Sequence, residues 1–244
     1  MIISNRSNKP TSIGLTLSDA SVVVDVVTEF KLLGCTLDNK LQFSTYVDLL
    51  KKTILQKLFA IKKLFFLSRS IKLHFFKTFL LPHFDYCSSL FVYFNKTSLE
   101  KLKKVYNSCI YNLLGVDLSG KTLDEKLMIL EPFNLLPFFY RLFLRTSLFY
   151  HKILNSKILS QINDDLKKCD SHDLRMKTKN LFIVPVCKSA CGSKRLSLFL
   201  PKFCNSVIRE AYNLNVADFK CFLLGNLPIL FKKFNSSFLN LTIL

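Results

Sequence analysis

Short apolar runs with alternating polar positions fill the first forty residues, a pattern typical of β-strands. Residues 12–17 alternate, and residues 22–27 are rich in β-branched valine. A third strand is predicted over residues 30–37, broken at Gly34, where the missing side chain permits a bulge or a close backbone approach. Asp38 and Asn39 then have the chemistry of a turn.

From Thr45 the apolar period changes to three and four residues, which predicts an amphipathic helix. Its apolar positions are Val47, Leu50, Ile54, Leu58, Ile61 and Phe65. The pairs Lys51-Lys52 and Lys62-Lys63 lie eleven residues apart, close to three helical turns, so all four lysines share one face. The sequence therefore predicts a helix with a core side and a lysine side.

Two more helices are expected to complete a compact bundle. One begins near Ser70 and is kinked or stopped at Pro82, because proline interrupts the hydrogen bonding of a helix. The other begins at Thr97, where Thr-Ser-Leu-Glu fits a capping box, and ends at Gly115, which suits the left-handed position after a last turn.

Beyond Gly115 the pattern predicts helices over residues 122–130, 133–159, 201–212 and 216–224. The polar, basic segment 163–197 is expected to be flexible, with residues 181–184 as a lone strand. The predicted fold class is α+β and mainly α, with short N-terminal antiparallel strands followed by a helical bundle and a helical extension.

Charge and cysteine content narrow the class of protein. The 244 residues are 50% hydrophobic, which is enough to bury a core, and 35 Lys plus Arg against 17 Asp plus Glu give a net charge of +18. This excess indicates a polyanionic partner, nucleic acid or an anionic membrane surface, unless it is only solvated helix surface. The cysteines, mostly in apolar segments, favour packed thiols and a reducing compartment.

The chain start and the hydropathy favour an intracellular protein. The first residues lack a basic region followed by an apolar core, so no secretory signal is expected. The most apolar 18-residue window still contains Asp85, so no spanning helix is expected and no membrane partner is predicted. The expected location is the nucleus or the cytoplasm.

Three segments, in order, resemble a known family. They are EFKLLGCTLDNKLQF (residues 29–43), FLLPHFDYC (79–87) and LEKLKKVYNSCIYNLLG (99–115). This order is similar to the C-terminal side of reverse transcriptases of non-LTR retrotransposons of the LINE type, such as jockey-like elements. The family shows an F-K-x-L-G strand and turn, a P-x-x-D-Y-C segment and an L-E helix that ends in glycine. Where that family has W-N further on, this chain has Cys204-Asn205.

The resemblance implies three parts: residual palm strands over 1–43 with a turn like the primer grip, a thumb-like bundle over 44–115, and a basic, mainly helical extension over 116–244. In such polymerases the primer grip supports the primer end and the thumb holds the duplex. The implied nucleic-acid-binding residues are Lys31, Leu33, Gly34, Lys51, Lys52, Lys62 and Lys63. Lysines on a helix face suit binding of RNA or DNA through phosphates, without reading bases.

The family's catalytic motif is missing. Polymerisation needs metal ions, Mg²⁺ in this family, held by the carboxylates of a Tyr/Phe-Ala-Asp-Asp hairpin. That motif is expected upstream of residue 1, and Asn163-Asp164-Asp165 follows the thumb in the wrong order and suits a solvated turn. The chain is thus expected to be a polymerase fragment, inactive alone and without a cofactor.

Two alternatives remain open. Cys169, His172, Cys187 and Cys191 are residue types that bind zinc, although their spacing alone is weak support. The chain is alternatively an independent α-helical interaction protein, or a pseudogene product with no selected function. Residues 49–67 also resemble a basic amphipathic helix for a membrane surface or a partner groove, but the two helices that follow favour burial.

Overall fold

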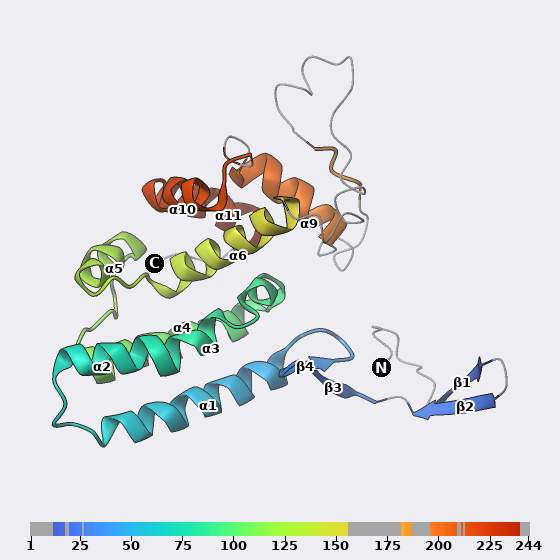
Figure 1. Ribbon diagram of the computed structural model, residues 1–244, viewed down its shortest axis with the longest axis horizontal. Helices are drawn as coiled ribbons and strands as arrows, with labels where there is room; N and C mark the ends of the chain where they lie inside the picture. The colour runs from blue at the N-terminus through green and yellow to red at the C-terminus, as the bar shows by residue number, and fades with distance from the viewer. Residues whose placement is uncertain are drawn as a thin grey trace, which may run out of the picture. The chain divides into compact units, whose positions relative to one another are not determined.

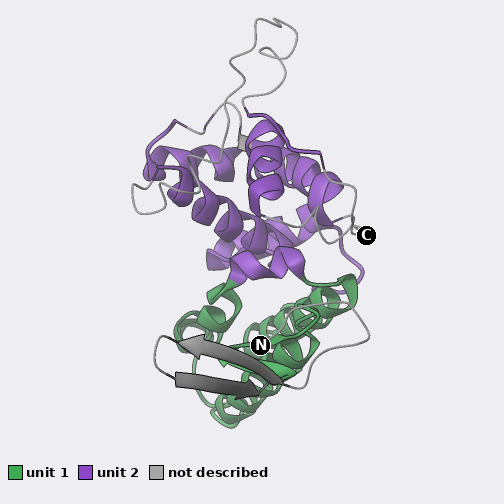
Figure 2. Cartoon of the chain, turned by 90° about the vertical axis from the view of Figure 1, so that its right-hand side faces the viewer, with its two compact units in different colours: residues 1–87, 94–116 green, residues 88–93, 117–244 purple. Residues whose placement is uncertain are grey.

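The computed structural model describes residues 12–17, 20–25, 27–155, 182–186, 196–208, 211 and 213–239 (Figure 1). The described elements are short antiparallel strands followed by helices, so the predicted α+β, mainly α class is confirmed. The chain divides into two compact units, residues 1–87 with 94–116 and residues 88–93 with 117–244 (Figure 2). The predicted division into palm, thumb and extension stays a prediction.

Four strands in unit 1 form two separate hairpins. Strand β1 (Ser12–Leu17) pairs antiparallel with β2 (Ala20–Asp25), and β3 (Glu29–Leu32) pairs with β4 (Cys35–Asp38). The predicted single strand over 30–37 is wrong, because Leu33 and Gly34 turn the chain with φ of 46° and 84°. Two successive positive φ values are typical of a tight hairpin turn, in which glycine is favoured.

The three-helix bundle is built around α1 and α4. Helix α1 (Ser44–Lys62) buries Tyr46, Val47, Ile54, Leu58 and Ile61 on one face. Helix α4 (Lys96–Leu114) buries a longer stripe and packs along α1, as the predicted periodicity implies. These two apolar faces form the core of unit 1 together with Phe76, Leu80 and Phe84 of the stretch between them, two of which contact Tyr106 of α4.

One continuous helical stretch lies between α1 and α4. It comprises α2 (Arg69–Phe75), a π-helical segment η1 (Phe76–Leu80) and α3 (Leu81–Asp85), with helical φ and ψ at each junction. The stretch begins at Ser68, whose hydroxyl accepts from the Ile71 N–H at 3.4 Å. Of the two outcomes predicted at Pro82, a kink or a stop, the stop is wrong: the helix continues to Asp85, the π-helical backbone ends just before Pro82, and proline sits in the first turn of α3, where its missing N–H is tolerated.

The ends of α4 test two predictions. The predicted capping box at Thr97 is wrong, because Asn95 is the N-cap and its side-chain oxygen accepts from the Ser98 N–H at 2.7 Å. Gly115 is the C-cap as predicted, with φ of 64° and its N–H donating to the Tyr111 carbonyl. Asparagine is at least as good an N-cap as threonine, so the local sequence alone does not decide between Asn95 and Thr97 as the start of α4.

Every regular element that the structure describes in unit 2 is helical. These elements are η2 (Ser88–Tyr93), α5 (Leu123–Leu130), η3 (Glu131–Phe133), α6 (Phe138–Asn155), α9 (Leu196–Phe203), η6 (Cys204–Ile208), α10 (Val216–Gly225), α11 (Leu227–Phe234) and η7 (Asn235–Leu239). The predicted helices over 122–130 and 216–224 are confirmed. The helix predicted from residue 133 begins at Phe138, because Asn134 turns left-handed with φ of 52°.

Aromatic rings fill the centre of unit 2. Phe143, Phe203, Phe231 and Phe234 are fully buried, and Phe231 contacts rings from α6 on several sides. The predicted helix over 201–212 begins earlier, at Leu196, and includes Pro201. Most of the segment 163–197 lies outside the described residues.

The lone strand predicted over residues 181–184 is wrong in its described part, where only Phe182 forms a bridge and residues 183 and 184 have no regular secondary structure. An asparagine side chain holds Phe182. Phe182 is buried, its N–H donates to Asn205 Oδ1 at 3.0 Å, and its carbonyl accepts from Asn205 Nδ2 at 2.8 Å. This pair of bonds satisfies both backbone groups of Phe182, as a neighbouring strand would. The amide of Asn205 therefore fastens residues 182–186 to η6.

Within the described ranges, no single helix is long and apolar enough to cross a bilayer. Residues Leu123–Phe133 and Phe138–Asn155 reach that length and hydropathy only as a pair, and they are bent by 79°.

Replacing Gly115 by Ala is expected to lower the free energy of unfolding by about 1 kcal/mol, because a Cβ is strained at positive φ. Space is not the reason, since nothing lies within 4 Å of the added atom. Gly225→Ala is the control: it also meets nothing within 4 Å, lies in α10 and is expected to be neutral or stabilising. Urea unfolding measures both, and equal effects would contradict the role given to φ.

Candidate nucleic-acid interface

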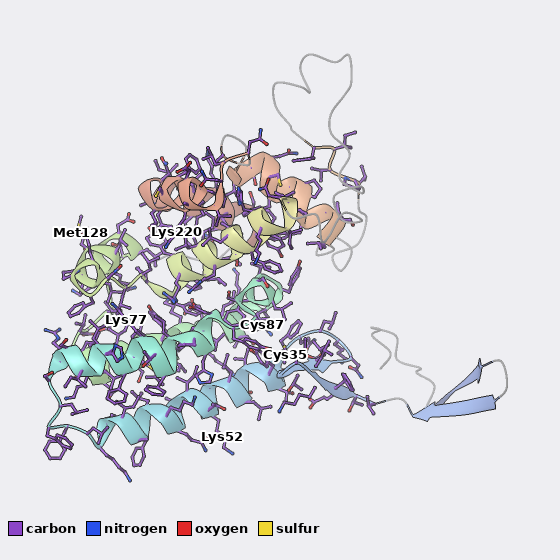
Figure 3. The ribbon with its side chains drawn as sticks, viewed as in Figure 1. Cys35, Lys52, Lys77, Cys87, Met128 and Lys220 are labelled. Carbon is purple, nitrogen blue, oxygen red and sulfur yellow. The ribbon has the colours of Figure 1, made fainter. Side chains whose placement is uncertain are left out.

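The four lysines predicted on one face of α1 lie there in the structure. We call Lys51, Lys52, Lys62 and Lys63 the lysine stripe; all four side chains are exposed. Lys52 points away from α2 and α3 (Figure 3). By helical geometry Lys52 and Lys63 lie opposite the buried residues of α1, and Lys51 and Lys62 lie at the edge of the buried face, so all four charges stay on the solvent side.

The spacing of the stripe suits a phosphate backbone. Eleven residues of α-helix separate the two lysine pairs, a rise of about 16 Å. Successive phosphates lie about 3.4 Å apart along the axis per strand, so the two pairs reach phosphates about five apart. Long, flexible lysine side chains tolerate the remaining mismatch.

Carboxylates are scarce around the stripe. From Leu49 to Phe84 the sequence has eight Lys or Arg residues and no Asp or Glu. The one acidic side chain of α1, Asp48, lies 2.9 Å from Lys101 Nζ on α4, and both side chains are substantially exposed at 57% and 40%. Exposed ion pairs contribute little to stability, so Asp48 chiefly offsets the charge of Lys101 and leaves the stripe cationic.

A groove lies beside the β3–β4 hairpin. Its volume is about 590 Å³. We call it the hairpin groove; it is lined by Lys31, Gly34 and Thr36 of the hairpin, Tyr46, Leu49, Leu50 and Thr53 of α1, and Pro82, His83 and Tyr86 at the end of α3. Two of the predicted primer-grip residues, Lys31 and Gly34, thus line one concave surface.

Tyr86 fixes the turn of the hairpin. Its hydroxyl donates to the Leu33 carbonyl, and a Cβ placed on Gly34 would meet the ring at 3.8 Å, an ordinary contact. Gly34 is therefore required by its φ and not by a close approach of the chain. The Leu33 side chain is 83% exposed, so its side chain, and not its carbonyl, is offered to a partner.

His83 brings a second cation to the groove. Lys57 Nζ lies 2.7 Å from His83 Nε2. Burial and then the charge of Lys57 lower the pKa of His83, which keeps the ring neutral at pH 7 and able to accept a hydrogen bond from the Lys57 ammonium at Nε2. The groove therefore has lysine ammonium groups near two of its walls.

The structure does not bring the lysine stripe and the hairpin groove onto one face. On a regular helix Lys52 and Lys63 lie about 100° around the axis from the middle of the groove wall, and Lys51 and Lys62 about 160°. The two predicted sets are separate surfaces joined through α1. Whether each predicted residue binds nucleic acid stays a prediction.

Asp38 organises the loop that joins the hairpin to α1. Its carboxylate accepts from the backbone N–H groups of Lys40, Gln42 and Phe43, at 2.9, 3.1 and 2.6 Å. Partial burial acts to raise the pKa of Asp38, but the three donors outweigh it and hold the pKa below its usual value. These bonds fix Leu41 and Phe43, both at positive φ, ahead of α1.

Two further groups of predicted residues have different outcomes. The zinc candidates Cys169, His172, Cys187 and Cys191, and the Asp164-Asp165 pair, lie outside the described residues. In the described part, no three His, Cys, Asp or Glu side chains gather as for a metal ion. Burial raises the pKa of the Cys109 thiol to about 12, so this cysteine packs as a neutral apolar group, as predicted.

Sequence reasoning missed the contacts made by Lys57, His83 and Tyr86. The segment that contains His83 and Tyr86 carries a proline signal and a family resemblance, but nothing in its sequence shows which residues of α1 or the hairpin it meets. Partners more than fifty residues apart, such as Leu33 and Tyr86, become visible only in the fold.

No protein-family model, no curated protein and no solved structure matches this chain.

Asp38→Asn is expected to lower the free energy of unfolding by about 1 kcal/mol at pH 7, because the bonds to a charged acceptor weaken. Since the folded pKa of Asp38 is depressed, its contribution is present above the unfolded pKa near 3.9 and is lost as pH falls through the folded value. Urea unfolding at pH 7 and at pH 2 to 4 measures this. If the difference in free energy of unfolding between wild type and variant does not shrink in acid, the result would contradict the role given to the charge of Asp38.

Proposed function

We propose that this chain is a sequence-independent nucleic-acid-binding module, equivalent to the thumb and adjoining palm edge of a non-LTR retrotransposon reverse transcriptase. One observation carries the proposal: α1 buries its apolar face and keeps four lysines exposed outside it, in a stretch without carboxylates from Leu49 to Phe84. Such a surface attracts polyanions and reads no base.

The three quoted sequence segments support the family assignment within this proposal. Unit 1 contains all three: the hairpin, the end of α3 and α4. In the proposal, the lysine stripe contacts the phosphates of a duplex, and the hairpin turn at Leu33 and Gly34 meets the strand end, as the resemblance implies.

The proposal assigns binding and no chemistry to these residues. The 244-residue sequence has no Tyr/Phe-Ala-Asp-Asp motif to hold Mg²⁺, so the proposed module binds RNA, DNA or their hybrid without extending it. In the alternative function, that of an independent helical interaction protein, the exposed lysines have no polyanionic partner.

Binding is tested with a short RNA–DNA hybrid by fluorescence anisotropy between about 50 and 200 mM salt. Changing Lys51, Lys52, Lys62 and Lys63 to Ala is expected to weaken binding at least about tenfold. The slope of log affinity against log salt is expected to become less negative by about 3, because up to four counterion releases are lost.

The control removes the same charge elsewhere: Lys152, Lys220, Lys232 and Lys233, all exposed and all in unit 2, are changed to Ala. It is expected to retain most of the affinity. An equal loss of affinity in the control would show that binding depends on net charge alone and would contradict a site at the lysine stripe. If the wild-type chain does not bind at low salt, the result favours the helical interaction protein.

A further inference from the structure

Three phenylalanine rings are exposed at one end of α1. The exposed fractions are 64% for Phe59, 79% for Phe65 and 71% for Phe66. We call these three residues the aromatic tip. Single exposed apolar side chains are normal on a protein surface, but a cluster of large rings on adjacent turns marks a binding surface.

The aromatic tip is continuous with the lysine stripe. By helical geometry Phe59 lies between the directions of Lys52 and Lys62 on the exposed face of α1. Lys63 Nζ lies 5.0 Å from the centre of the Phe59 ring, and Phe65 and Phe66 follow two and three residues later. A cation and a ring are thus in contact at the end of α1, and two more exposed rings follow in the turn after it.

The turn after α1 holds the two outer rings in place. The Leu64 N–H donates to the Ile61 carbonyl at 3.0 Å, and the Leu67 N–H donates to the Leu64 carbonyl at 3.2 Å. Lys72 Nζ on α2 donates to the Phe65 carbonyl at 3.0 Å. Phe65 is therefore fixed at its backbone while its ring extends into solvent.

The ring geometry leaves Phe65 a face for a planar ligand. Phe65 and Phe66 meet edge to face, with centroids 6.0 Å apart and planes at 82°. An edge-to-face pair does not cover both faces of its rings. Proteins that bind single strands use this arrangement: a base stacks on an aromatic ring, and neighbouring cationic side chains contact the phosphates.

We propose that the aromatic tip binds unpaired bases, so that the ligand of α1 is a nucleic-acid duplex with a single-stranded extension. The lysine stripe holds the phosphates and Phe65 stacks on a base where the duplex ends. This inference rests on the proposed function, since it assigns the rings to the same ligand as the stripe.

An anionic membrane surface is the competing ligand, and the structure favours it less. Helices that lie in a bilayer surface insert their whole apolar face. The apolar face of α1 is buried in the bundle, so only the tip remains for insertion. Three rings with two lysines between the first and the second give little area for a bilayer but suffice to stack one or two bases.

The chain has no tryptophan, so Phe65→Trp introduces a single fluorescent indole at the tip. The variant is titrated with an unlabelled RNA–DNA duplex carrying about six unpaired uridines, and with the same duplex blunt-ended. Stacking predicts quenching of the indole by the extended duplex and little quenching by the blunt one. Binding of each duplex is followed separately by anisotropy.

The Phe65→Leu variant tests how much stacking on Phe65 contributes to the affinity for the extended duplex. It keeps an apolar side chain but removes the plane, and it is expected to weaken binding of the extended duplex about fivefold to a hundredfold while leaving the blunt duplex unchanged. Phe149→Leu is the control, because Phe149 is 45% exposed on α6, away from the stripe in sequence and in the other unit. It is expected to change neither affinity.

The outcomes separate the two proposals. If both duplexes bind with equal quenching or none, or if Phe65→Leu leaves the extended duplex unaffected, the aromatic tip is refuted and the lysine stripe stands. Absence of any binding refutes both. A blue shift of the indole with phosphatidylserine vesicles, without a response to nucleic acid, would overturn the inference in favour of a membrane surface.

Discussion

The packing of α1 along α4 determines where the charge of unit 1 lies. A helix that buries a stripe such as Val47, Ile54 and Leu58 has its rotation about its own axis fixed, since turning it would bring charge into the core. The lysines are then confined to the solvent side by the same constraint that stabilises the bundle. The cationic surface is in this sense a product of core packing, and the four lysines need no contacts of their own to stay aligned.

The β3–β4 hairpin depends on a different kind of interaction. Its first strand is exposed along its whole length and only Cys35 of its second strand is buried, so burial contributes less here than in the helices, and hydrogen bonds at the ends of the hairpin add to it. Tyr86 holds the turn, Asp38 holds the exit loop, and the Thr45 hydroxyl donates to Glu29 Oε1 at 2.7 Å. The hairpin groove is consequently shaped by a few hydrogen bonds at its rim.

Periodicity and end signals were sufficient to predict the helices of the bundle and the role of Gly115, because these depend on residues within a turn or two of each other. They were insufficient at Gly34, where alternation suits one broken strand or two paired strands equally well. The N-cap at Asn95 was missed because two good caps stand two residues apart. The lysine face was predictable from spacing alone, but the groove was not, since Lys31, Tyr46 and His83 meet only through tertiary packing.

The π-helical segment η1 has a consequence for how this sequence tolerates change. A π turn completes its rotation with about one more residue than an α turn, so Phe76–Leu80 accommodates an extra residue between α2 and α3. Losing one residue there would restore a regular α turn and leave α3 in nearly the same angular phase relative to α2, whereas the same loss within α3 would rotate everything beyond it by about 100°. His83 and Tyr86 would keep their places in the groove in the first case and leave them in the second. The chain length of this helical stretch is thus less constrained at η1 than in the regular turns that follow it.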